Sequence, residues 1–133
     1  MSLMIKLQSI VLDCSNPSEL AKFYRELLGG EITYEIEPFV CVSIPGESIS
    51  ISCQYEEAYF PPVWPGSPED QRKMEHLDFT VMNIEEAVEY AVSLGATKPD
   101  SQYWSPELGS PWVTLLDPAG HPFCLCLHED DLS

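Results

Sequence analysis

Residues 115–125 read LLDPAGHPFCL, and this stretch predicts a tight turn between two strands near the end of the chain. Pro118 fixes the backbone angle φ that begins such a turn, and Gly120 supplies a positive φ at little steric cost. Apolar runs flank the turn on both sides, over residues 112–116 and 122–127. We therefore expect a hairpin of two strands here.

A strand and a helix precede this hairpin in the sequence. Residues 76–81, HLDFTV, alternate strictly between polar and apolar side chains, as in a strand with one buried face. Asn83 followed by Glu86 is the pattern that begins a capped helix, and apolar residues at helical spacing continue to Gly95. With a further strand predicted over residues 102–104, this half of the chain has the order β-α-β-β-β.

The first half of the chain repeats the same order 67 residues earlier. Residues 9–14 have the pattern of a strand, and residues 16–19 begin a helix that two glycines at 29 and 30 end. Three further strands are predicted at residues 31–37, 39–44 and 48–54. A small sheet with a helix on one face leaves its other face uncovered, so we expect the two sheets to pair.

These patterns predict an α+β fold in which two βαβββ modules form paired, curved, mixed sheets around a cavity, with the helices outside. The length of 133 residues is typical of a single domain. Module 1 covers about residues 5–55 and module 2 about residues 74–129. The connector over residues 56–73 is rich in proline, and long loops of this kind often form the edge of a binding site.

The net charge of −16 is the most unusual bulk property of the chain. So acidic a protein repels phosphate backbones and anionic lipids, which argues against nucleic acid and membrane surfaces as partners. A neutral or cationic ligand is favoured, although an acidic surface can also serve solubility alone. Residues 1–4 lack the features of a secretory leader, and no apolar run is long enough to span a membrane, so we expect a cytoplasmic location.

The cysteines of the chain predict reduced, buried thiols rather than a disulfide framework. They are odd in number and lie in apolar or alternating runs without any CxxC spacing. This spacing also argues against a zinc ribbon. The five residues are Cys14, Cys41, Cys53, Cys124 and Cys126.

The double βαβββ order and the LLDPAGHPFCL turn resemble the vicinal oxygen chelate superfamily of glyoxalases, bleomycin resistance proteins and extradiol dioxygenases. The turn is similar to the family's Asp-Pro-x-Gly hairpin before the last strand, and the glycine-terminated helices add to the likeness. The resemblance covers nearly the whole chain, and it is strongest to a glyoxalase-like branch of small bacterial proteins.

The resemblance also implies a metal site, because family metals are held by four inward-facing positions on the first and last strands of the modules. Carried onto this sequence, the four positions are Ser9, Ser50, His76 and Cys124. Serine hydroxyls bind divalent ions poorly. The pair His76 and Cys124 with waters could hold zinc, but a catalytic zinc site normally has three protein ligands. We therefore expect no metal ligand set and no cofactor.

The alternation within residues 76–81 indicates the same inward-facing side of the sheet, independently of the family resemblance. His76, Asp78 and Thr80 are expected to point away from the helix, towards the side on which Cys124 lies. A histidine beside a thiol can lower the thiol pKa and produce a nucleophile. Alternatively, His76 is a hydrogen-bonded wall residue and Cys124 packs as a small apolar side chain, or the whole face is exposed to solvent.

Aromatic residues gather in the connector and around the middle of the second module. Such residues can line a pocket, face a cationic ligand or form a dimer interface. Candidates for catalysis are His76, Cys124 and Glu107, the last as a base or cation partner. The predicted ligand-binding residues are Ser9, Ser50, His76, Asp78, Cys124, Trp64, Trp104 and Trp112.

Three classes of function follow from these observations. The favoured one is a homodimeric protein that binds a neutral or cationic, partly aromatic small molecule without a metal. The second is a lyase, isomerase or oxygenase of the glyoxalase or dioxygenase type, acting on a small oxygenated metabolite. The third is a dimeric regulator or accessory domain with no ligand.

Overall fold

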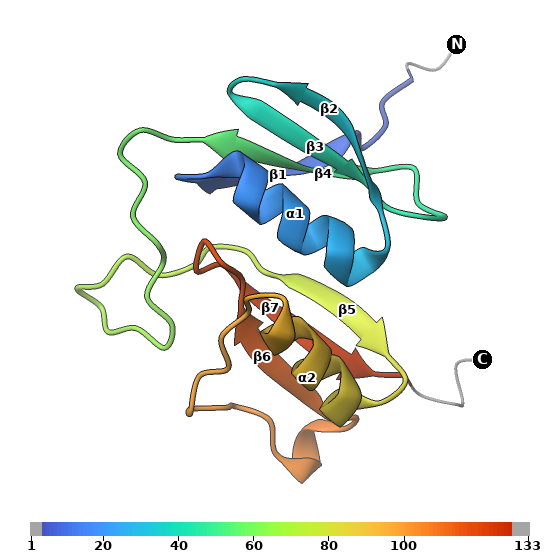
Figure 1. The fold of residues 1–133 in the computed structure, drawn as a ribbon. Helices are drawn as coiled ribbons and strands as arrows, with labels where there is room; N and C mark the ends of the chain where they lie inside the picture. The colour runs from blue at the N-terminus through green and yellow to red at the C-terminus, as the bar shows by residue number, and fades with distance from the viewer. Residues whose placement is uncertain (1–3, 129–133) are drawn as a thin grey trace. The chain divides into compact units, whose positions relative to one another are not determined.

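The computed structural model describes residues 4–128, which form two compact units that divide between Tyr59 and Phe60 (Figure 1). Each unit contains a mixed sheet and a helix, so the predicted α+β class is confirmed. Two predictions fall partly on residues outside the described part of the chain. They are the lack of leader features, at residues 1–3, and the end of module 2, at residue 129. Within the described part of the chain, no helix has the length and apolar character needed to cross a membrane.

The first unit is a four-stranded sheet with the order β1-β4-β3-β2. Strands β1 and β4 are parallel, whereas β3 is antiparallel to both of its neighbours. This arrangement matches the β-α-β-β-β order predicted from the sequence. The elements are β1 (Ser9–Cys14), α1 (Pro17–Leu28), β2 (Glu31–Ile36), β3 (Phe39–Ser43) and β4 (Ser50–Tyr55).

Helix α1 begins and ends at the residues that its capping pattern predicts. The side chain of Asn16 accepts a hydrogen bond from the backbone N–H of Glu19, and Gly29 ends the helix in a left-handed conformation with φ of 66°. The apolar face of α1 packs on β3 and β4. Phe23 and Tyr24 on this face are almost fully buried and meet edge to face, with ring centroids 5.0 Å apart.

The chain passes from α1 to β2 through a close backbone contact at Gly30. Its backbone N–H donates to the carbonyl of Arg25, which completes the end of the helix. A Cβ atom at this position would collide with the backbone carbonyl oxygen of Ser43 and would lie 3.2 Å from the side chain of Val42. Only glycine therefore lets the start of β2 lie this close to the end of β3.

The second unit repeats the arrangement with one strand fewer. Its three-stranded sheet has the order β5-β7-β6, with β5 parallel to β7 and β6 antiparallel to it. Helix α2 packs on β6 and β7, and the Asn83 side chain caps its first turn by accepting from the N–H of Glu86. The elements are β5 (Leu77–Val81), α2 (Ile84–Ser93), a short 3-10 helix η1 (Pro106–Leu108), β6 (Trp112–Leu116) and β7 (Pro122–Leu127).

The prediction of a strand over residues 102–104 is wrong, because these residues form no strand. A side chain takes its place at the edge of β6, where the Gln102 amide donates to the Thr114 carbonyl and accepts from the Thr114 N–H, both at 2.9 Å. A single isolated bridge between Thr97 and Leu116 extends this edge. Both backbone groups of Thr114 are therefore satisfied without a fourth strand.

The predicted Asp-Pro-Ala-Gly turn is present between β6 and β7. Asp117 is buried, and its Oδ1 atom accepts from the N–H groups of Ala119 and His121, both at 2.9 Å. Gly120 completes the turn with φ of 91°. On the far side of this turn Phe123 enters the core between the sheet and α2 with no exposed surface.

Candidate functional site

The second sheet has one apolar face and one polar face, as the alternation in residues 76–81 predicts. On the apolar face the rings of Phe79 and Phe123 meet at 5.9 Å, beneath α2. On the opposite face the backbone register places Asp78 beside Cys124, and Cys124 in turn beside Thr114. The polar face therefore collects its functional groups from three adjacent strands.

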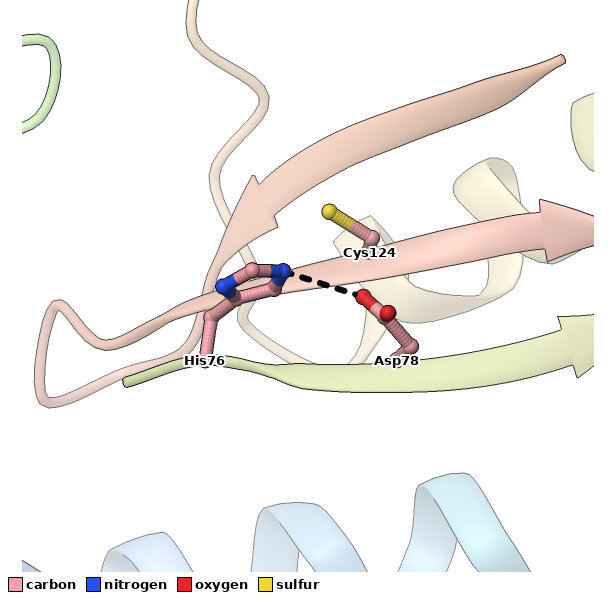
Figure 2. A group of neighbouring side chains, drawn as sticks. All are labelled: His76, Asp78 and Cys124. Atoms are coloured by element: carbon pink, nitrogen blue, oxygen red, sulfur yellow. Dashed lines mark ion pairs between the residues drawn. The ribbon is translucent and has the colours of Figure 1, made fainter. Parts of the chain in front are cut away.

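His76, Asp78 and Cys124 form a cluster on this polar face (Figure 2). His76 precedes β5 and Asp78 lies two residues further along the chain, so both side chains point to the same side of the sheet. The imidazole Nε2 atom lies 3.1 Å from the Asp78 Oδ1 atom. The Cys124 thiol comes from β7, and the donor atoms of all three residues lie within 4.8 Å of one another.

The environment of Cys124 favours a protonated thiol. Burial raises its pKa, the hydrogen bond with Thr114 lowers it, and the nearby Asp78 carboxylate raises it again. The Thr114 Oγ1 atom lies 3.2 Å from the sulfur. Burial likewise raises the pKa of Cys126 to about 11. A thiolate nucleophile activated by His76, one of the alternatives from the sequence, therefore gains no support from the thiol's surroundings.

A cavity of about 320 Å³ opens above this cluster within the second unit. Its floor is formed by the cluster with Thr114 and Cys126, and aromatic side chains form its walls. Two of these, Trp64 and Tyr103, meet edge to face with ring centroids 5.3 Å apart. The full lining is Trp64, Lys73, His76, Asp78, Tyr103, Trp112, Thr114, Cys124 and Cys126.

The connector supplies part of this cavity, as its length suggested. Trp64 and Lys73 both belong to the segment predicted as a connector, and both line the cavity in the second unit. Lys73 and Asp78 bring opposite charges to its surface. The cavity is therefore amphipathic, with apolar walls and a floor that offers one carboxylate, one imidazole, a hydroxyl and two thiols.

The other predicted site residues lie elsewhere. Ser9 and Ser50 belong to the first unit, where they are direct partners in the parallel pairing of β1 and β4. Trp104 does not line the cavity, and its indole N–H donates to the carbonyl of Gly109 at 3.1 Å. Glu107 lies in η1, fully exposed, and a hydrogen bond with Ser105 lowers its pKa. All three tryptophans of the chain belong to the second unit.

The predicted set of ligand-binding residues lacks four residues that line the cavity: Lys73, Tyr103, Thr114 and Cys126. Thr114 could have been found from the alternation of β6, because it lies two residues after Trp112 and so shares its face. Lys73 has no such signal, since it sits in a loop whose path depends on tertiary contacts. His76 and Asp78 pair with each other along one stretch of chain, two residues apart.

Comparison with known proteins identifies the family. The sequence model of the glyoxalase-like domain matches residues 9–126, which is most of the chain. This chain belongs to the glyoxalase-like domain family. The resemblance to the vicinal oxygen chelate superfamily is thereby confirmed. No curated protein shows a significant match in sequence to this glyoxalase-like domain.

Solved structures show the same fold at low sequence identity. A glyoxalase/bleomycin resistance protein/dioxygenase family enzyme from Burkholderia phytofirmans PsJN has a TM-score of 0.69 at 16% identity, over 92% of this chain and 98% of that one. The fosfomycin resistance protein FosX from Listeria monocytogenes has a TM-score of 0.70 at 14% identity, over 97% and 98%. A variant of FosX in complex with Mn(II) and 1S,2S-dihydroxypropylphosphonic acid has a TM-score of 0.67 at 16% identity, over 93% and 90%.

The donor atoms on the second sheet decide which metal this glyoxalase-like domain could hold. The first unit offers only the hydroxyls of Ser9 and Ser50 at its corresponding positions, and these are poor ligands. The second unit offers an imidazole nitrogen, a carboxylate oxygen and a sulfur in one cluster. Such a mixed set fits a zinc-type ion and does not fit Mg²⁺ or Mn²⁺, which prefer oxygen ligands.

Proposed function

We propose that this glyoxalase-like domain is a cytoplasmic protein that binds a neutral or cationic, partly aromatic small molecule above the second sheet, with no need for a metal. The observation that carries this proposal is the cavity itself, in which three aromatic walls face a polar floor. Apolar walls with a few convergent polar groups are the usual composition of small-molecule sites. A volume of about 320 Å³ suits a ligand with a single aromatic ring.

The preference for a neutral or cationic ligand rests on the floor of the cavity. Asp78 is the one carboxylate of the lining, and it faces the same space as the aromatic walls. A cation can therefore gain both charge attraction and cation–π contact in one position. Lys73 on the lining opposes this preference for a cation. The net charge of the whole chain, −16, favours a cation over an anion.

A thermal-shift series tests the proposal with three matched probes: benzyltrimethylammonium, benzyl alcohol and phenylacetate. We expect the first two to raise the melting temperature and the anion to have the smallest effect, because only a ligand that prefers the native state stabilises it. Trp112→Ala should weaken binding about fivefold, since an aromatic contact contributes about 1 kcal/mol. Treatment with EDTA should leave the shifts unchanged.

The control for this series is Phe60→Ala, because Phe60 belongs to the same unit, is 70% exposed and does not line the cavity. It should bind all probes as the parent protein does. A series in which phenylacetate alone stabilises the protein would show that the proposed ligand class is wrong. Loss of every shift in Phe60→Ala would show that the site lies elsewhere.

We also propose that the two modules form one domain and that the chain associates as a homodimer. The support is the sheet face that each helix leaves uncovered, which association can bury at low cost. Light scattering at micromolar concentration should give twice the 14.9 kDa mass of the chain. A strictly monomeric mass would contradict the dimer without affecting the ligand site.

A second function, an enzyme of the glyoxalase or dioxygenase type, is favoured by one observation. The cluster of His76, Asp78 and Cys124 supplies donor and acid-base groups at the floor of the cavity. A FosX variant in complex with Mn(II) shares the fold at 16% identity, which carries no substrate over to this chain. The enzyme reading therefore depends on whether the cluster binds an ion.

A further inference from the structure

We propose that His76, Asp78 and Cys124 bind one zinc-type divalent ion, with all three protein ligands supplied by the second sheet. This goes beyond the proposed ligand binding, which needs no ion. It also differs from the pattern that the family resemblance implies, in which both modules contribute ligands. Asp78, which has no place in that pattern, becomes the third ligand.

The spacing of the three donor atoms supports a common ion. The His76 Nε2 and Asp78 Oδ1 atoms are 3.1 Å apart, and all donor atoms of the cluster lie within 4.8 Å of one another. Around a tetrahedral zinc ion, bonds of about 2.0–2.3 Å place neighbouring ligand atoms about 3.3–3.7 Å apart. Small side-chain rotations of Asp78 and Cys124 can make up the difference, while the paired strands β5 and β7 hold the backbone in register.

The chemistry of the donors selects the ion. Imidazole and thiolate favour Zn²⁺ over Mg²⁺ and Ca²⁺, which take oxygen ligands. The ion must displace the proton of the Cys124 thiol, so binding releases protons and weakens as the pH falls. Once the sulfur is a thiolate, the Thr114 hydroxyl, 3.2 Å away, can turn its proton towards it as an outer-shell donor.

The cavity leaves room for a ligand at the open side of the cluster. The side chains of His76 and Asp78 are 37% and 62% exposed, and both line the cavity. Three protein ligands with an open fourth position are typical of catalytic rather than structural zinc sites. A bound ion there would supply a Lewis acid for an oxygen atom of a small molecule.

Cobalt substitution tests the site directly, without any assay of activity. Protein freed of metal with EDTA and kept reduced with a phosphine is titrated with Co²⁺ and followed by absorbance. We expect a near-ultraviolet charge-transfer band from a thiolate–cobalt bond and visible bands of a tetrahedral ion, both removed by Zn²⁺. Absence of the charge-transfer band in the parent protein at millimolar Co²⁺ would overturn the proposal.

Variants assign the ligands. Cys124→Ser should abolish the charge-transfer band, and Asp78→Asn, which keeps the side-chain shape, should weaken Co²⁺ binding by more than about tenfold, since even loss of an outer-shell partner has an effect of this size. Cys41→Ser is the matched control, because this thiol lies in the first unit and a hydroxyl can keep its hydrogen bond with Ser52. A band that survives Cys124→Ser, or that Cys126→Ser removes instead, would contradict the assignment.

The titration also separates this inference from the proposed function. Wild-type protein that shows no cobalt band but binds benzyltrimethylammonium supports the ligand site and overturns the ion site. Protein that gives the cobalt band but no thermal shift with any probe supports the ion site and overturns the aromatic-ligand site. Far-UV circular dichroism of each variant establishes that its sheet and helices are retained.

Discussion

Replacement of Phe123 by alanine is expected to lower the free energy of unfolding by about 3–5 kcal/mol. Phe123 has no exposed surface, contacts the ring of Phe79, and lies on β7 between Leu77 on β5 and Leu115 on β6. Its removal leaves a cavity that the paired strands cannot close, because their register is fixed on both sides. Urea denaturation followed by far-UV circular dichroism measures the loss.

Two further substitutions make this result interpretable. Phe123→Leu keeps most of the volume and should cost clearly less than the alanine variant. Phe60→Ala removes the same ring from a site that is 70% exposed, and it should change stability by less than about 0.5 kcal/mol. A loss below about 1 kcal/mol for Phe123→Ala would show that Phe123 does not fill the core of the second unit.

Replacement of Gly30 by alanine is expected to destabilise the protein by about 2–3 kcal/mol. The new Cβ atom would collide with the carbonyl oxygen of Ser43, a backbone atom that cannot move without shifting β3. The same denaturation experiment gives the size of the effect. The loss should be accompanied by an unchanged far-UV spectrum in the absence of urea.

The control is Gly46→Ala, because it also replaces a glycine by alanine but creates no collision with another atom. Gly46 has φ of 78°, and its Cβ position has no atom within 4 Å. Its substitution therefore carries only the cost of a left-handed backbone, about 1–2 kcal/mol. If Gly30→Ala costs less than Gly46→Ala, the close contact between β2 and β3 is not as tight as described.

The elements that could be predicted from the sequence are those with a local signal. Asn16 and Asn83 cap their helices through side-chain hydrogen bonds to residues three positions later, which a short window of sequence contains. The Asp-Pro-Ala-Gly turn is equally local. The alternation of residues 76–81 correctly placed His76 and Asp78 on one face, and the parallel pairing of first and last strands brought Cys124 beside them.

The features that sequence reasoning missed depend on contacts between distant residues. The Gln102 amide imitates a strand by bonding both backbone groups of Thr114, and no propensity scale anticipates a side chain in that position. The sequence left the direction of the Cys124 pKa open, and the structure raises it because burial and the Asp78 carboxylate outweigh the hydrogen bond with Thr114. Lys73 reaches the cavity only through the path of the connector.

The confinement of Trp64, Trp104 and Trp112 to the second unit gives the protein a built-in optical reporter. Intrinsic indole fluorescence records the melting of that half alone, whereas far-UV ellipticity averages over both helices. In the Gly30→Ala variant, whose lesion lies in the half without indoles, a fluorescence midpoint that moves together with the ellipticity midpoint would mean that the two halves unfold in concert. An unmoved fluorescence midpoint would mean that each half melts by itself.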